Sequence, residues 1–341
     1  MSIKKAGEKS ITEHTTFDEL RDTPGIFSEY MKWIQPTDKG IPVSKTIKEY
    51  CGFQSEETAL ALNMMKKQLE QGSGIFADIY SKKEIMESED RNETQLFVFP
   101  QKKRSPLALI IPGGGYHKVC TILEGIPIAW KLWSEGYSVA LIKYRTDQNG
   151  IMPKPIDDVA AALRWIEKHE KRLGVSLDNY IVVGFSAGGH LAGEWGTTVN
   201  GYAKYGMKKP KALILAYAAA SVHLYDEIIK KDNEQDEKTA VAKEFMVNLI
   251  GKDYNEAEME LYSVDMQIDE HYPPTYLIHS HGDPLAPFES SVCLDAKLNQ
   301  YHVSHEFVKL EYSGHGFALW LNGTEETKDW MNQALAFVDN L

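Results

Sequence analysis

One serine stands between two glycines in the motif Gly184-Phe-Ser-Ala-Gly188, directly after the apolar run Tyr180–Val183. The residues that follow, His190–Ala192, are compatible with a helix. The pattern therefore predicts a strand, a tight turn and a helix, which is the setting of a nucleophile elbow that exposes the hydroxyl of Ser186. Because glycine and serine also mark ordinary turns, the motif needs partners elsewhere in the chain.

The first partner of such a serine is a general base, which is itself oriented by a carboxylate. His315 in "YSGHGF" follows the expected strand His305–Leu310 and is flanked by glycines, so we predict that it is the base. His190 is too close to Ser186 along the expected helix to aim at its hydroxyl. Other histidines in helices or surface stretches are expected to be solvated or to pack: His14, His169, His223, His271 and His302.

The acid should follow the end of a strand that lies between the serine and the histidine in chain order. Asp283 does so, two residues after His281, in "TYLIHSHGDPLAP". An aspartate before proline is also common in turns, and Asp265 and Glu289 are alternatives that follow a strand end less directly. The order of Ser186, Asp283 and His315 is that of an α/β-hydrolase triad.

Acyl transfer also needs backbone N–H groups that receive the developing negative charge. Ala187, the residue after the nucleophile, supplies one, and the glycines of Pro112–Tyr116 can approach a substrate without Cβ interference. We expect Gly114 and Gly115 to complete this oxyanion hole. A nucleotide-binding loop is the competing interpretation, but neither phosphate-loop nor dinucleotide-binding spacing is present.

Apolar strands alternate with amphipathic helices from about residue 75 onward. This alternation predicts an α/β fold with a mainly parallel central sheet and helices on both faces, with the chemistry at the carboxyl ends of the strands. Expected strands are 94–99, 107–111, 137–144, 180–183, 212–216, 275–280 and 305–310, and expected helices are 126–135, 156–169 and 325–341.

Two segments depart from this rhythm. Residues 1–72 are predicted to be a helical extension, because Thr16–Glu19 has capping-box spacing and Glu56–Gln71 is amphipathic. Residues 73–341 would then form the catalytic domain. Within it, residues 221–270 are highly charged in their middle, which is consistent with a lid or with a long surface excursion.

The bulk composition narrows the function classes. The 341 residues are 43% apolar and carry a net charge of −12, so nucleic acid and anionic membranes are poor partners. Neither a secretory h-region nor an apolar run of the roughly 20 residues needed for a membrane span is present. The three widely spaced cysteines suggest no disulfide framework and no Cys-x-x-Cys metal site, so we expect reduced thiols in a cytoplasmic protein. A homodimer is left open.

The segment 106–317 resembles the α/β-hydrolase superfamily, in the acetyl-esterase and carboxylesterase branch that includes acetylxylan and feruloyl esterase-like proteins. The matching stretches are "PGGGY", "YR" at 144–145, "PIDDVAAALRWI", "GFSAGGHLA", "PPTYLIHSHGDPLAP" and "GHGF". The resemblance implies the same triad and oxyanion hole, and a structural role for Asp157 or Asp158 in tying down a loop. Pro112 replaces a histidine that is frequent in lipase-like members, and Ala286 replaces a frequent valine.

The expected activity is hydrolysis of a carboxylic ester through an acyl-enzyme, with no metal or organic cofactor. The resemblance implies a small acyl group, acetyl first, on a small-molecule substrate such as an acetylated sugar or oligosaccharide. Tyr116, His117 and Trp320 are candidates for lining the pocket, and core packing is the alternative for them. A prolyl-oligopeptidase-like peptidase, an arylformamidase-like amidase and a non-catalytic hydrolase-fold binding protein are the other functions considered.

Overall fold

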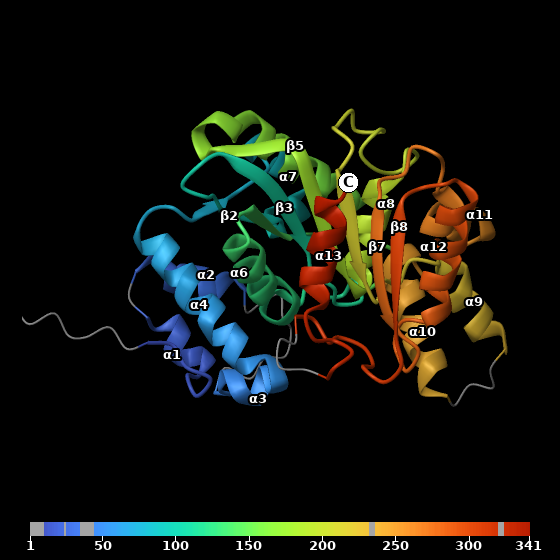
Figure 1. Ribbon diagram of the computed structural model, residues 1–341, viewed down its shortest axis with the longest axis horizontal. Coiled ribbons are helices and arrows are strands. Elements are labelled where there is room, and N and C mark those ends of the chain that lie inside the picture. Colours follow the sequence, from blue (N-terminus) through green and yellow to red (C-terminus); the bar gives the residue numbers. More distant parts are fainter. Residues whose placement is uncertain (1–9, 24, 35–43, 232–235, 320–323) are drawn as a thin grey trace, which may run out of the picture.

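A single eight-stranded sheet forms the centre of the computed structural model, which describes residues 10–23, 25–34, 44–231, 236–319 and 324–341 (Figure 1). The strand order is β1-β2-β4-β3-β5-β6-β7-β8. The six strands from β4 to β8 in this order run parallel, whereas β1 and β2 are antiparallel additions at one edge. The strands are β1 (Ile75–Ala77), β2 (Gln95–Phe99), β3 (Ser105–Ile111), β4 (Ser138–Lys143), β5 (Val175–Phe185), β6 (Ala212–Ala216), β7 (Thr275–Ser280) and β8 (His305–Leu310).

The predicted α/β class with a mainly parallel sheet is confirmed. Every residue of the central strands β6 and β7 is buried, because helices cover both faces of the sheet. The bounds of β6, β7 and β8 match those expected from the sequence. Strand β5 begins earlier than expected, and the short edge strand β1 was not expected.

Two helical layers enclose the sheet (Figure 1). One layer holds α6 (Ile126–Ser134) and α13 (Trp330–Asp339), whose apolar residues share one core cluster with the N-terminal helices. The opposite layer packs in a second cluster. Its helices are α7 (Lys154–Leu173), α8 (Ser186–Gly196), α9 (Val222–Lys231), α10 (Glu237–Ile250), α11 (Glu256–Leu261) and α12 (Phe288–Gln300). Shorter elements are α5 (Lys82–Glu87), η1 (Gly52–Gln54), η2 (Glu89–Glu93), η3 (Thr121–Gly125) and η4 (Val264–Gln267).

The N-terminal segment folds into α1 (Phe17–Arg21), α2 (Ile26–Ile34), α3 (Ile47–Cys51) and α4 (Ser55–Glu70). The predicted capping box is present, because the Thr16 hydroxyl accepts the N–H of Glu19 and the Glu19 carboxylate accepts the N–H of Thr16. Buried side chains of these helices, such as Leu62, belong to the same cluster as α6 and α13. The helical extension therefore packs against the hydrolase sheet and shares its core.

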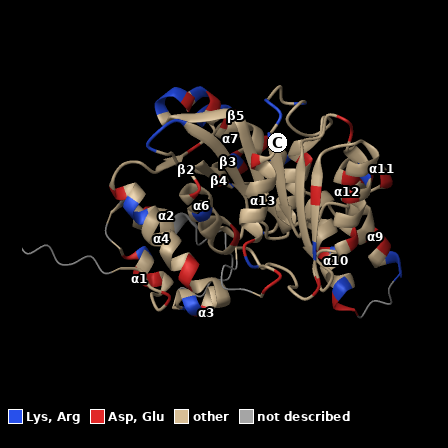
Figure 2. Ribbon diagram, viewed as in Figure 1, with Lys and Arg blue, Asp and Glu red and all other residues tan. Residues whose placement is uncertain are grey.

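The segment between β6 and β7 contains α9, α10, α11 and η4. Its helix α10 contacts the loop after β3, because the side-chain amide of Asn248 donates to the carbonyl oxygen of Gly115 over 3.0 Å. Acidic and basic residues are interspersed over this and the other outer helices (Figure 2). Among the described residues, no helix is both long enough and apolar enough to cross a membrane.

Candidate active site

Ser186 stands at a sharp turn between β5 and α8. Its φ of 53° lies in the left-handed region, which residues other than glycine rarely adopt. A nucleophile elbow requires this strained conformation. Glycine is required on both sides of it. A Cβ on Gly184 would come within 2.4 Å of the Gly188 carbonyl oxygen, and one on Gly188 within 2.2 Å of the Ile111 carbonyl oxygen. The motif thus lets α8 begin immediately against the ends of β3 and β5.

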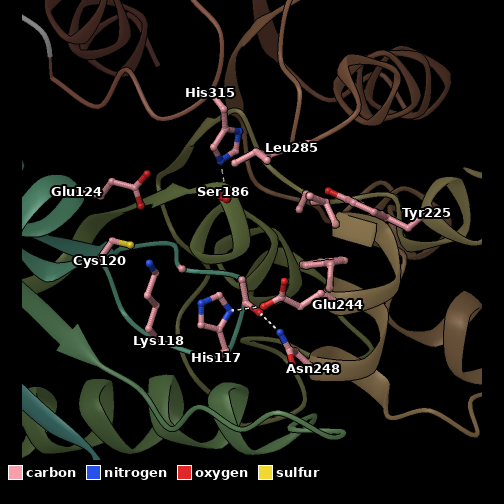
Figure 3. Close-up of a pocket in the computed structure, with 16 residues that line it drawn as sticks. His117, Lys118, Cys120, Glu124, Ser186, Tyr225, Glu244, Asn248, Leu285 and His315 are labelled. Carbon is pink, nitrogen blue, oxygen red and sulfur yellow. Dashed lines mark hydrogen bonds and ion pairs between the residues drawn. The ribbon is translucent and has the colours of Figure 1, made fainter. Parts of the chain in front are cut away.

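His315 lies in the loop after β8 and points toward Ser186 (Figure 3). Its Nε2 atom is 2.9 Å from the Ser186 hydroxyl oxygen, and its Nδ1 atom is 2.7 Å from Asp283 Oδ2. Because an ionised carboxylate only accepts hydrogen bonds, the imidazole proton lies on Nδ1. Nε2 is then the lone-pair nitrogen that can take the serine proton.

Asp283 is held in its ionised form within a buried turn after β7. Burial disfavours its charge, but hydrogen bonds from His279 and His315 outweigh burial and hold the pKa of this carboxyl well below its usual range. The other carboxylate oxygen accepts the backbone N–H groups of Leu285 and Ala286, at 2.8 and 2.9 Å. The acid is therefore fixed in position and in charge.

The loop after β3 brings Gly114 and Gly115 to the wall of the cavity that contains Ser186 and His315. Both have positive φ values, 127° and 60°. A Cβ on Gly114 would come within 2.4 Å of the Lys118 carbonyl oxygen, so only glycine fits there. Ala187 follows Ser186 in the first turn of α8, where N–H groups have no partner within the helix. These N–H groups are the ones that could stabilise an oxyanion.

The cavity that Ser186 and His315 line has a volume of about 300 Å³. One part of its wall is apolar and comes from Tyr225, Phe245 and Leu285. Polar side chains line another part, and Figure 3 shows His117 and Glu244 side by side there, with His117 Nδ1 3.4 Å from Glu244 Oε1. The residues from α9 and α10 show that the segment between β6 and β7 forms part of this wall.

The model of the BD-FAE family matches residues 96–298, which is more than half of the chain and includes Ser186 and Asp283. The chain belongs to the BD-FAE family. Among curated relatives, it is 24% identical over 221 residues to esterase LipC of Mycobacterium tuberculosis. This match covers 64% of this chain and 54% of the relative. It is 26% identical over 211 residues to an acetylxylan esterase of Xylanibacter ruminicola, covering 61% of this chain and 40% of the relative. The chain thus spans about half the length of these relatives.

Solved structures share the fold of this BD-FAE member. The acetyl ester-xyloside bifunctional hydrolase from Caldicellulosiruptor lactoaceticus superposes with a TM-score of 0.64 at 23% identity, covering 78% of this chain and 96% of that one. Esterase B from Lactobacillus rhamnosis superposes with a TM-score of 0.61 at 18% identity, covering 83% and 96%. These likenesses establish the α/β-hydrolase fold.

The three residues suggested for substrate binding have different positions in the structure of this BD-FAE member. His117 lines the cavity. Tyr116 does not line it and takes the core-packing alternative instead, because its ring is fully buried in the core and its hydroxyl lies 2.7 Å from His190 Nδ1. Trp320 lies outside the described residues. Tyr116 has a φ of 61°, in the left-handed region, and its ring packs near those of Tyr144 and Phe245.

The competing candidates for the acid are placed elsewhere. Asp265 lies 3.1 Å from His223 in a separate cluster, and Glu289 lies in the first turn of α12. Asp158 has the structural role that the resemblance implied, because its buried carboxylate accepts the backbone and side-chain N–H groups of Arg145 and anchors the loop after β4. Asp157 accepts the hydroxyl of Tyr205.

Sequence reasoning missed two buried residues that contact the site. His279 Nε2 lies 3.1 Å from both Asp283 Oδ2 and the Ala286 carbonyl oxygen, so this nitrogen must carry a proton. Glu124 accepts the N–H of Gly113 over 2.7 Å and the hydroxyl of Tyr217 over 3.0 Å. The signal for Glu124 was its position as the only charged residue in the apolar stretch "VCTILEGIPIAW".

Proposed function

We propose that this protein is a serine esterase that hydrolyses small carboxylic esters through an acyl-enzyme. The observation that carries the proposal is the hydrogen-bonded line from Ser186 through His315 to Asp283 at the base of the cavity. This geometry supports general-base activation. The Ser186 hydroxyl oxygen is 2.9 Å from His315 Nε2, and His315 Nδ1 is 2.7 Å from Asp283 Oδ2.

The reaction follows from the positions of these groups. His315 Nε2 takes the Ser186 proton while the serine oxygen attacks the ester carbonyl carbon. The N–H groups of Gly114, Gly115 and Ala187 would stabilise the oxyanion of the tetrahedral intermediate. Its collapse breaks the carbon–oxygen bond of the ester, and His315 gives its proton to the departing alcohol. His315 then takes a proton from water, whose oxygen attacks the carbonyl carbon of the acyl-serine. Collapse of this second intermediate breaks the bond between the acyl carbon and the Ser186 oxygen, and His315 returns its proton to Ser186 as the carboxylic acid leaves.

The proposed substrate is a short acyl ester, acetyl first, of a carbohydrate. A cavity of about 300 Å³ is at the lower end of the range for small-ligand sites, which suits a short acyl chain. The polar wall around His117, Glu244 and Asn248 offers hydrogen-bonding groups for sugar hydroxyls. The names of two similar proteins, an acetylxylan esterase and an acetyl ester-xyloside hydrolase, support the same substrate class.

The test compares the wild-type protein with Ser186→Ala on p-nitrophenyl acetate, butyrate and octanoate, together with acetate release from acetylated xylo-oligosaccharides. We expect turnover to fall as the acyl chain lengthens, and Ser186→Ala to lower kcat by at least about a thousandfold. Ser304→Ala, an exposed serine, is the matched control and should retain the wild-type rate.

Three outcomes would count against the whole proposal or a part of it. Unchanged ester turnover in folded Ser186→Ala would remove Ser186 as the nucleophile. Absence of ester turnover in the wild type, combined with hydrolysis of a formamide or an anilide, would redirect the site to an amidase. Ester turnover without acetate release from the oligosaccharides would overturn only the carbohydrate part.

A further inference from the structure

Three potential metal ligands gather at a place that the esterase chemistry does not use. His223 lies on α9, Asp265 on η4 and Cys293 on α12, and the ligand atoms of the three side chains are all within 4.8 Å of one another. His223 Nε2 lies 3.1 Å from Asp265 Oδ2. Among the described residues that line the catalytic cavity, none of these three is present.

The cluster contains a buried oxygen with an unmet hydrogen-bonding need. Asp265 is 4% exposed, and its Oδ1 atom has no hydrogen-bond partner at normal distance among the described residues. Burial raises the pKa of this carboxyl, against the smaller opposing effects of Ser221 and His223. Burial also raises the pKa of the Cys293 thiol, and the neighbouring charge of Asp265 adds to that effect. A cation bound between them would favour the deprotonated, metal-binding forms of both groups.

The ligand types select the metal. One imidazole nitrogen, one carboxylate oxygen and one thiolate sulfur suit Zn²⁺, which accepts all three. Bonds of about 2.0–2.3 Å in a tetrahedron place neighbouring ligand atoms roughly 3.3–3.6 Å apart. The pair His223–Asp265 is already close to that value, and the widest pair must approach by about 1 Å, which rotation of the cysteine side chain can supply. We propose that His223, Asp265 and Cys293 bind one Zn²⁺ ion, with water in the fourth position.

An acidic surface cavity gives a cation access to His223. His223 is part of the lining of a surface cavity of about 520 Å³ between α9 and α11. Four carboxylates and one ammonium group also line it, which gives it a negative balance that attracts divalent cations. These residues are Asp226, Glu227, Glu256, Glu260 and Lys230. Figure 2 shows acidic positions on α9 and α11 around this part of the molecule.

The proposed site would connect the segment between β6 and β7 to the helix that follows β7. Two residues beyond His223, Tyr225 lines the catalytic cavity, so α9 contributes to both sites. Because an ion that binds only the folded protein stabilises it, Zn²⁺ should raise the unfolding midpoint by an amount that grows with the logarithm of its concentration relative to its Kd. The expected role is structural, in holding α9 beside α12.

The test uses reduced, full-length protein that has been treated with EDTA and desalted. Zn²⁺ is titrated in competition with a chromophoric chelator, and Co²⁺ serves as a spectroscopic substitute. We expect one Zn²⁺ per chain and a thiolate-to-Co²⁺ charge-transfer band. Cys293→Ser should abolish that band, and His223→Gln and Asp265→Asn should each weaken Zn²⁺ binding by about tenfold or more. Cys120→Ser and His271→Gln are matched controls that should keep wild-type binding.

The wild-type measurements alone can overturn the proposal, so it does not depend on how the variants fold. Absence of stoichiometric Zn²⁺ binding, or a Co²⁺ complex without a thiolate band, would exclude this site. Retention of the band in Cys293→Ser, or its loss in Cys120→Ser, would assign the ion to other residues. None of these readouts uses ester turnover, so the outcome is independent of the proposed esterase activity.

Discussion

At the scale of single residues, Glu124 links the two loops that the proposed mechanism needs. Its carboxylate binds the N–H of Gly113, next to the proposed oxyanion donors, and the hydroxyl of Tyr217. That hydroxyl also accepts the N–H of Ala318, and the Tyr217 ring lies edge-on against His315, with centroids 4.8 Å apart. Burial raises the pKa of Glu124, whereas the nearby His315 and the hydrogen bonds that Glu124 accepts from Gly113 and Tyr217 lower it. Glu124 is thus a positioning residue.

Replacing this carboxylate should slow the chemistry more than it weakens binding. Glu124→Gln keeps the shape, but its NH₂ group replaces one of the two acceptor oxygens, so either Gly113 or Tyr217 loses its hydrogen-bond acceptor. We expect kcat for p-nitrophenyl acetate to fall by about tenfold or more, with a smaller change in KM, because a misplaced oxyanion loop mainly affects the transition state. Steady-state kinetics and the rate of Ser186 labelling by a fluorophosphonate measure the two effects.

The control for this substitution is Glu89→Gln, at an exposed glutamate that does not line the cavity. It should leave both kcat and the rate of Ser186 labelling unchanged. A purely structural role for Glu124 predicts a different pattern. Folded Glu124→Gln would then label at the wild-type rate, while its urea midpoint decreased. That pattern would contradict the positioning role.

At the scale of elements, helix α8 carries two buried titratable groups, His190 about one turn and Glu194 about two turns after Ser186. Burial raises the pKa of Glu194 to about 8, against a hydrogen bond from Asn200, and burial lowers the pKa of His190 to about 4. Both side chains are fully buried, and both groups are therefore neutral near pH 7. The helix that positions Ser186 consequently depends on pH for its stability.

The sign of that dependence follows from proton binding. An unfolded glutamate ionises near pH 4.5, whereas folded Glu194 keeps its proton to about pH 8. Stability from this group is complete below 4.5 and is lost as the pH rises through 8. His190 acts in the opposite sense between about pH 4 and 6.5, so the window from about pH 6.5 to 8 separates the effect of Glu194 from that of His190.

Glu194→Gln should therefore remove the loss of stability above pH 7. We expect the free energy of unfolding of the variant, relative to wild type, to be more favourable at pH 9 than at pH 6, as measured by urea denaturation. Glu167→Gln, at an exposed position, should show the same pH dependence as the wild type. Parallel pH profiles for Glu194→Gln and the wild type would mean that Glu194 is ionised in the folded protein.

Local sequence patterns predict some of these elements and site residues and miss others. Strands β6, β7 and β8 were found because buried parallel strands are short apolar runs that end at turn residues. Edge strand β1 has only three residues and partly exposed side chains, so its pattern is too weak. Ser186, Asp283 and His315 each follow a strand end, and parallel strands bring such ends together. Glu124 and Tyr217 are 93 residues apart, and no local pattern predicts that contact.

At the scale of the whole molecule, the N-terminal helices and the hydrolase sheet should unfold together. Leu62 on α4 is fully buried in the cluster that also contains residues of α6, α13 and the central strands. Leu60, two residues earlier on the same helix, is 54% exposed. The two leucines therefore form a matched pair that separates core packing from helix propensity.

Leu62→Ala should lower the free energy of unfolding by about 2–5 kcal/mol, because it removes buried methyl groups and leaves a cavity. Leu60→Ala should change it by less than about 0.5 kcal/mol. Urea denaturation followed by far-UV circular dichroism and by tryptophan fluorescence gives two probes, since six of the seven tryptophans follow residue 72 and lie outside the N-terminal helices. If the shared core makes one cooperative unit, Leu62→Ala shifts both transitions equally. A shift in circular dichroism with unchanged fluorescence would instead show that the extension unfolds as a separate domain.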